Sequence, residues 1–266
     1  MNRIITALDF STPAQARALV ERLDPSLTRL KIGNQLYTLA GPSLVEECQK
    51  AGFDVFLDLK YHDIPNTVAS AVEAAAAMGV WMVNVHASGG PAMLQAARNA
   101  VQQFDRSAEH AGGTRLIAVT VLTSLDRNEL AAVGLDVEPA DQVTRLATLA
   151  RQAGLDGVVC SPHEVARIRA IAKSNFLTVT PGVRPDQGSS APVSVISSHG
   201  GKPDDQRRTL TPYDAIVAGS DFLVIGRPIT QAKSPLDVLH ALNAEVQIAA
   251  SQLSTTPSDQ QAHSDA

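Results

Sequence analysis

The sequence predicts an α/β fold, a single (β/α)8 TIM barrel, from three observations. Short apolar, β-branched runs recur along the chain, with Ala-rich amphipathic segments between them. The runs are almost continuously apolar, as expected of parallel strands that are buried on both faces. The 266 residues, 44% of them hydrophobic, suit one barrel domain with a large core.

The predicted strands and helices alternate in the order β then α. The strands are expected at residues 3–9, 28–33, 53–60, 80–87, 115–123, 156–161, 176–183 and 221–227. The clearest helices are expected at residues 12–23, 41–52, 67–79, 90–104 and 141–154, several of which close on Gly as helix C-termini do. An open doubly wound sheet is the competing fold, but no GxGxxG motif follows the first strand.

Two segments depart from this alternation. Residues 185–208 are rich in Gly, Ser and Pro and are long for a connection, which fits either a tolerated surface insertion or a mobile loop over an active site. Residues 251–266 contain few apolar side chains, and we expect a disordered tail there. The predicted organisation is one barrel domain over residues 1–250 followed by this tail.

Composition and charge exclude several classes of partner. The net charge of −5 and the interspersed acidic and basic residues give no basic face for nucleic acid or an anionic membrane. Cys48 and Cys160 lie far apart in apolar surroundings, which is typical of a reduced cytoplasmic protein without disulfides. No signal sequence opens the chain, and no apolar run reaches the roughly 20 residues of a membrane span, so we expect a soluble, unexported protein.

Polar side chains stand at the C-terminal ends of the predicted strands, where barrels place catalytic groups. Asp58 and Lys60 are two residues apart on one strand and therefore point to the same side. Asp63 follows where Pro65 turns the chain into a loop. Other polar residues at strand ends are Asp9, Lys31, His86 and Thr123.

Carboxylates and ammonium groups this close stabilise each other's charged forms. Lys60 would then be a cationic acid poised beside Asp58. A structural ion pair at a strand end is the alternative, because such networks also perturb pKa values without catalysing anything.

The loops after the last two strands predict a phosphate site. PGVRP (residues 181–185) and GRPIT (residues 226–230) follow the seventh and eighth strands, where barrels commonly bind phosphate. Arg184 and Arg227 offer forked hydrogen bonds, and Gly226 allows close approach of the backbone. The alternative is that these arginines are simply solvated.

These motifs together resemble one family closely, that of orotidine 5'-phosphate decarboxylase. The resemblance runs from ALD (7–9) through KIG (31–33), DLKYHDIPNTV (58–68), VTVLTS (119–124) and PGVRP to DDQRR (204–208) and VIGRPIT (224–230). It implies decarboxylation of orotidine 5'-monophosphate to UMP in de novo pyrimidine biosynthesis, without a cofactor or a metal.

The resemblance also implies a role for each matching residue. Asp58, Lys60 and Asp63 would form the charged array at C6 of the pyrimidine, with Lys60 protonating C6. Asp9 and Lys31 would hold ribose hydroxyls, and Thr123 would contact the ring. Gln206, Gly226 and Arg227 would bind the 5'-phosphate with Arg184 nearby, although Gln187 could be mistaken for Gln206. The family is homodimeric, so Asp63, Ile64 and Thr67 would come from the other subunit.

Two rival functions remain at this stage. A related barrel, 3-keto-L-gulonate 6-phosphate decarboxylase, shares a DxKxxD motif but uses magnesium through a glutamate where this chain has Lys31. A nucleotide-binding scaffold without catalysis would be expected to lose Lys60 or one of its aspartates, and all are present. His62 and His86 could be imagined as metal ligands with the nearby aspartates, but no HExxH motif or i, i+4 His pair supports this.

Overall fold

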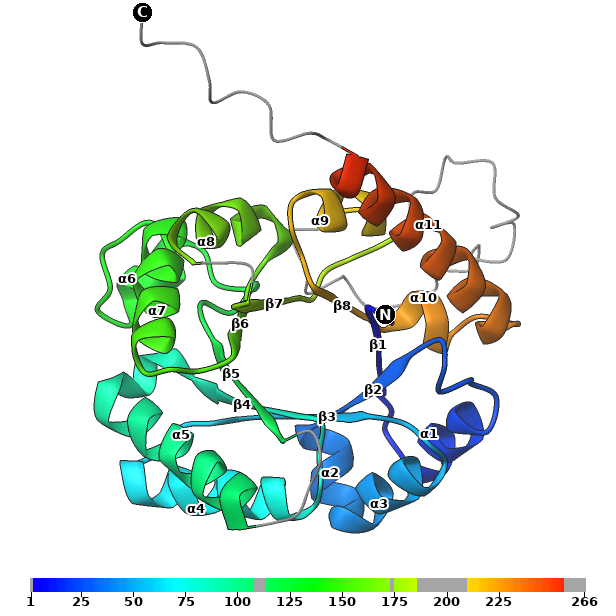
Figure 1. Ribbon diagram of the computed structural model, residues 1–266, viewed down its shortest axis with the longest axis horizontal. Helices are drawn as coiled ribbons and strands as arrows, with labels where there is room; N and C mark the ends of the chain where they lie inside the picture. The colour runs from blue at the N-terminus through cyan, green and yellow to red at the C-terminus, as the bar shows by residue number, and fades with distance from the viewer. Residues whose placement is uncertain (1, 108–112, 173–174, 186–209, 256–266) are drawn as a thin grey trace, which may run out of the picture.

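The computed structural model describes residues 2–107, 113–172, 175–185 and 210–255. Its centre is a closed barrel in which every strand pairs in parallel with its neighbours in sequence, and β8 closes onto β1 (Figure 1). The strands are β1 (Ile4–Ala7), β2 (Arg29–Gly33), β3 (Val55–Tyr61), β4 (Met82–His86), β5 (Arg115–Val119), β6 (Gly157–Val159), β7 (Leu177–Thr180) and β8 (Phe222–Ile225). Each predicted strand overlaps one of these, so the (β/α)8 barrel is confirmed and the open sheet is excluded.

Several strands end earlier than the apolar runs suggest. β1 ends at Ala7 and β5 at Val119, so Asp9 and Thr123 lie in the following loops rather than in strands. The runs stay apolar because residues of these loops are buried in the core between the strands and the helices. Val121 and Val183, for example, are 5% and 3% exposed although neither belongs to a named strand.

The two faces of the barrel strands have different environments. Outward side chains pack against the helix layer, whereas inward ones form a separate core inside the barrel. Members of that inner core are Ile5, Ala7, Phe56, Met82, Ile117, Val179, Phe222 and Val224. Because side chains alternate along a strand, Asp58 shares the inward face with Phe56, and Asn84 shares it with Met82. The barrel interior therefore changes from apolar to polar towards the C-terminal ends of its strands.

The helices form a ring around the barrel (Figure 1). They are α1 (Pro13–Val20), α2 (Asn34–Ala40), α3 (Pro42–Lys50), α4 (Pro65–Ala77), α5 (Gly90–Ser107), α6 (Arg127–Ala132), α7 (Pro139–Gln152), α8 (Val165–Ile171), α9 (Pro212–Val217), α10 (Arg227–Thr230) and α11 (Pro235–Thr255). The five clearest predicted helices are all present. Among the described residues, no helix combines the length and apolarity that a membrane span requires.

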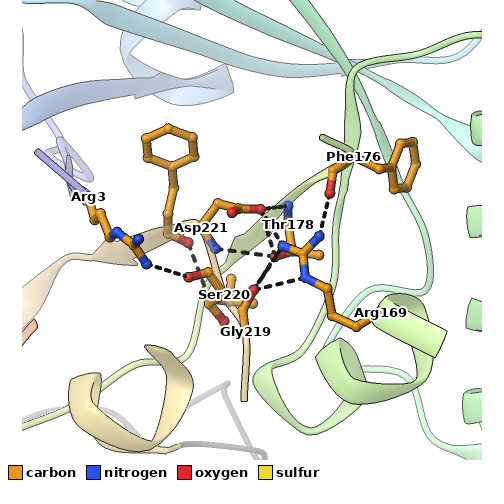
Figure 2. A network of polar contacts seen from close by, with 9 residues as sticks. Arg3, Arg169, Phe176, Thr178, Gly219, Ser220 and Asp221 are labelled. Atoms are coloured by element: carbon orange, nitrogen blue, oxygen red, sulfur yellow. Dashed lines mark hydrogen bonds and ion pairs between the residues drawn. The ribbon is translucent and has the colours of Figure 1, made fainter. Parts of the chain in front are cut away.

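A network centred on Arg169 fixes the N-terminal ends of β7 and β8 (Figure 2). The Arg169 guanidinium donates to the carbonyls of Phe176 at 2.7 Å and Gly219 at 2.8 Å, and it pairs with the Asp221 carboxylate. That carboxylate also accepts a hydrogen bond from the Thr178 N–H at 2.7 Å. The network ties α8 to the N-terminal ends of both strands.

The structure moves one predicted boundary. α11 runs to Thr255, beyond residue 250 where we placed the end of the barrel, because the Gln252 side chain contacts the Tyr213 hydroxyl and helical bonding continues. Residues 256–266 lie outside the described residues. So does nearly all of segment 185–208, whose flanks are joined where Val183 pairs with Leu210.

Candidate active site

A cavity of about 690 Å³ opens at the C-terminal ends of the strands. The predicted site residues that line it are Asp9, Lys31, Asp58, Lys60, Thr123, Arg184, Gly226 and Arg227. Phe56, Val119, Val159 and Val224 form part of its apolar wall. The barrel thus gathers into one cavity side chains that lie as far apart in the sequence as Asp9 and Arg227, with charged groups above an apolar floor.

Four charged side chains form a row of alternating sign inside the cavity. The Lys31 Nζ lies 3.2 Å from Asp9 Oδ1 and 3.2 Å from Asp58 Oδ2, and the Lys60 Nζ lies 2.7 Å from Asp58 Oδ1. Asp58 is therefore held between two ammonium groups. The ends of the row are more exposed than its centre. The Asp9 and Lys60 side chains are 68% and 30% exposed, whereas that of Asp58 is 10% exposed.

The electrostatics of the row favour its charged state. Burial acts to raise the pKa of Asp58, but the ammonium groups of Lys31 and Lys60 outweigh burial and lower it. For Lys31, burial acts to lower the pKa, whereas the carboxylates of Asp58 and Asp9 outweigh burial and raise it. Both groups remain ionised at neutral pH, so the cavity contains a fixed pattern of charge before any ligand binds.

Lys60 has an unusual backbone conformation. Its φ of 52° makes it the single non-glycine residue with positive φ in the described part of the chain, and the β3–β4 register shifts between Leu57 and Tyr61. A left-handed conformation at a lysine costs on the order of 1 kcal/mol or more. Such strain persists only where the surroundings hold it, and it is common at functional sites.

Asn84 on β4 supplies that support, and the sequence analysis did not identify it. Its Oδ1 accepts a hydrogen bond from the Lys60 N–H at 2.8 Å, and its Nδ2 donates to Asp58 Oδ1 at 2.7 Å. The residue is fully buried. The available signal was a lone amide inside the apolar run VWMVNVHA, at the same strand face as His86.

The opposite wall of the cavity is built by the loops after β7 and β8. Arg184 follows β7, where its backbone N–H donates to the Leu210 carbonyl at 2.9 Å. Gly226 precedes α10, and a Cβ there would lie 3.6 Å from the Ala7 Cβ and 3.8 Å from Asp9 Oδ2, in space that the cavity uses. Arg227, Thr230 and Gln231 complete this wall.

Comparison with known proteins identifies the family. The model of the "Orotidine 5'-phosphate decarboxylase / HUMPS family" matches residues 2–242, nearly the whole chain. The chain belongs to this family. Its relatives include proteins named orotidine 5'-phosphate decarboxylase from Tolumonas auensis, 52% identical over 91% of this chain and 97% of the relative, and from Nitrosospira multiformis, 54% identical over 92% and 94%. The crystal structure of orotidine 5'-phosphate decarboxylase from Lactobacillus acidophilus matches with a TM-score of 0.78 at 33% identity, covering 92% of this chain and 99% of that one.

Three residues expected from the family resemblance do not line the cavity of their own chain. Asp63, Ile64 and Thr67 lie on the loop after β3 and the first turn of α4, and all are exposed. Ile64 is 68% exposed, a high value for a large apolar side chain. Asp63 Oδ1 accepts a hydrogen bond from the Ile64 N–H at 2.6 Å. Within one chain, the acidic partner of Lys60 is thus Asp58.

The remaining predictions concern Gln206, His86 and a metal site. Gln206 and its alternative Gln187 lie outside the described residues. His86 packs against His62 with ring centroids 5.5 Å apart, and burial, followed by the nearby His62 and Lys60, lowers its pKa. Among the described residues, no cluster of three or more His, Cys, Asp or Glu side chains is arranged to hold a metal ion.

Proposed function

We propose that this protein converts orotidine 5'-monophosphate to UMP and CO2 in de novo pyrimidine biosynthesis. The observation that carries the proposal is the charged row of Asp9, Lys31, Asp58 and Lys60, with Lys31 and Asp58 buried at its centre, in a cavity that Arg184 and Arg227 also line. The names of relatives that are about half identical over nearly the whole chain support the same reaction.

The cavity offers complementary groups for each part of this substrate. Arg184, Gly226 and Arg227 would bind the 5'-phosphate, because guanidinium groups make forked, charge-assisted hydrogen bonds with phosphate oxygens. Gln206, from the segment outside the described residues, would add a contact. Asp9 and Lys31 would hold the ribose hydroxyls, and Thr123 would contact the pyrimidine ring.

The reaction needs stabilisation of negative charge at C6. When the bond from C6 to the carboxylate breaks, its electron pair stays on C6, where no adjacent carbonyl delocalises it. The Lys60 ammonium would stabilise that charge and then transfer a proton to C6, and the neutral amine would regain a proton from solvent. Asp58 would face the substrate carboxylate, so that their repulsion falls as CO2 leaves.

The 5'-phosphate would supply much of the binding energy that holds the substrate carboxylate against the repulsion of Asp58, because the phosphate does not react itself. The two arginines that line the cavity are well placed for this role. Interactions with a part of the substrate remote from the reacting bond can then be expressed as faster turnover rather than only as tighter binding.

We infer that the reaction requires no metal or organic cofactor. The positive charge that a metal ion would provide in a magnesium-dependent barrel is supplied by Lys60 and Lys31, whose ammonium groups lie 2.7 Å and 3.2 Å from Asp58. Lys31 also occupies the strand-two position where the sugar-phosphate decarboxylase has its glutamate ligand. An ammonium group there would repel a divalent cation.

The wild-type protein tests this proposal directly. Orotidine 5'-monophosphate should lose ultraviolet absorbance as UMP forms, at the same rate with and without EDTA. Loss of activity with EDTA would favour the magnesium-dependent rival. Retention of UMP or orotidine 5'-monophosphate without turnover by folded protein would favour a binding protein.

We also propose a homodimer in which Asp63, Ile64 and Thr67 complete the partner's site. The exposure of all three, outside the cavity of their own chain, supports this. The proposed location is the cytoplasm, which agrees with two free, buried cysteines, Cys48 and Cys160. The proposed partners are the small-molecule substrate orotidine 5'-monophosphate and a second copy of the chain. We propose no nucleic-acid or membrane partner.

Subunit mixing tests the shared site. Lys60→Ala and Asp63→Ala homodimers should each be nearly inactive, but co-refolding them in equal amounts should restore roughly a quarter of wild-type activity, because half of the dimers then hold one intact site of two. If Asp63 acts within its own chain, no mixed dimer contains an intact site and activity will not return.

A further inference from the structure

We propose that Asn84 is a positioning residue that holds Lys60 and Asp58 in their reactive arrangement. This inference rests on the proposed function and extends it to a residue on a different strand. Asn84 touches neither the expected phosphate nor the ribose site, since it is absent from the residues that line the cavity. It acts through the two charged groups that it contacts.

The geometry explains why an amide is needed at this position. Asn84 must accept from the Lys60 N–H at 2.8 Å and donate to Asp58 Oδ1 at 2.7 Å, and an amide provides an acceptor and a donor on one rigid plane. A carboxylate can accept but cannot donate, and an aliphatic side chain can do neither. Full burial of Asn84 leaves no water to replace either hydrogen bond.

The first hydrogen bond stabilises the unusual backbone of Lys60. In a regular strand the Lys60 N–H would be available to the neighbouring backbone, but the β3–β4 register shifts here and the Asn84 side chain takes the N–H instead. The backbone can then adopt its φ of 52° without leaving an unpaired buried donor. This conformation sets the direction in which the Lys60 side chain leaves β3.

The second hydrogen bond fixes the carboxylate that Lys60 meets. Asp58 Oδ1 receives both the Asn84 amide and the Lys60 ammonium, each at 2.7 Å, while Oδ2 faces Lys31 at 3.2 Å. The carboxylate therefore cannot rotate without losing a partner on each oxygen. Asn84 thus couples the backbone of the proposed proton donor to the orientation of the neighbouring anion.

A purely structural role is the competing explanation, because any buried amide with two hydrogen bonds contributes to folding. The two roles differ in what they affect. Misplacing Lys60 should reduce turnover while leaving the phosphate and ribose contacts intact, whereas general destabilisation should weaken every ligand contact together.

The test compares Asn84→Ala and Asn84→Asp with a matched control. Asn243→Ala also removes an amide with two hydrogen bonds, to the carbonyls of Leu27 and Leu239, but on α11 and outside the cavity. For each protein, kcat is measured with orotidine 5'-monophosphate and the Kd of UMP by calorimetry. Asn84→Ala should lower kcat about 100-fold, the scale expected when a reacting group is misplaced by about 1 Å, and should change the Kd of UMP less than about 3-fold. Asn243→Ala should leave both values near wild type.

Asn84→Asp adds a pH profile that a structural role does not predict. The new carboxylate would face Asp58 and Lys60 from β3, Lys31 from β2 and His86 from its own strand. Two adjacent carboxylates that share a proton have one raised pKa. The protonated form replaces the lost amide donor, so activity relative to wild type should rise as the pH is lowered from about 8 to about 6.

Each result decides between the explanations. Wild-type kcat in Asn84→Ala, or equal losses in kcat and UMP affinity, would overturn the inference. So would failure of both variants to fold, which would assign Asn84 to stability. An inactive wild type that binds UMP would instead refute the proposed function, and the inference with it.

Discussion

Replacing Lys31 with methionine should destabilise the folded protein by an amount that depends on pH. Methionine has a similar length but no charge, so Asp58 would keep Lys60 and Asn84 and lose its second ammonium. Two unit charges 3.2 Å apart interact by about 5 kcal/mol at an effective dielectric constant of 20. Part of this is offset because the buried ammonium no longer has to be desolvated, and the 68% exposed Asp9 adds about 1 kcal/mol at most.

The expected net loss is about 3 kcal/mol in the free energy of unfolding at about pH 7.5, the lower end for breaking a buried pair. For a domain of this size the melting temperature should fall by about 6–12 °C. Lys50→Met is the matched control, because Lys50 pairs with Glu46 at 3.6 Å on an exposed helix surface. Its effect should stay below about 0.5 kcal/mol.

The pH dependence follows from the direction of the Asp58 pKa. In the wild type this pKa is lowered, so the stability that the ionised carboxylate contributes is lost only as the pH falls through that lowered value. In Lys31→Met the ammonium of Lys31 no longer offsets the effect of burial on Asp58, so the pKa of Asp58 rises. Protonation of Asp58 then removes its partly uncompensated charge. Urea titrations should therefore give a smaller difference in the free energy of unfolding between variant and wild type at about pH 5 than at about pH 7.5. An equal difference at both pH values, or none, would refute the reasoning.

Two further predictions follow from the same geometry. Arg227→Ala should lower kcat/KM for the phosphorylated substrate by about 10- to 1000-fold, since a charge-assisted contact contributes a few kcal/mol. The control Arg167→Ala, which removes an exposed ion pair with Asp141, should leave kcat/KM unchanged. Unchanged kinetics in Arg227→Ala would contradict the phosphate assignment. The pKa of His86 is lowered from 6.5 mainly by burial, so its contribution to stability is present above that value and is lost as the pH falls. His86→Gln should therefore reduce the loss of stability between about pH 7.5 and about pH 5.5 in denaturant titrations, and an unaltered pH dependence would argue against a half-buried neutral imidazole.

The strand pattern carried most of the fold prediction. Continuous apolar runs identified every barrel strand, because burial on both faces leaves a signal that does not depend on exact pairing. The same burial hid the strand ends, since loop residues such as Val121 and Val183 are as buried as strand residues. Three short helices, α2, α6 and α10, come in addition to the predicted single helix after each strand, although the Asp126 and Glu129 capping box of α6 was visible in the sequence.

The charged residues of the site were predictable because they stand at strand ends, where apolar patterning breaks. Asn84 was not, because one amide in a buried run is usually read as a satisfied core residue. The positive φ of Lys60 could not be predicted either, since it depends on the register between β3 and β4 and on a side chain from another strand. The assignment of Asp63 depends on a second subunit, which local sequence does not describe.

The most direct test of the central claim is the turnover of orotidine 5'-monophosphate by the wild type and by Lys60→Ala, followed by ultraviolet absorbance, with UMP binding measured for both. The account predicts rapid conversion by the wild type and a loss of about 1000-fold or more in kcat for Lys60→Ala, with UMP still bound, because both charge stabilisation and proton transfer at C6 would be removed. Turnover by Lys60→Ala at the wild-type rate would contradict the claim that the row ending at Lys60 is the reaction centre.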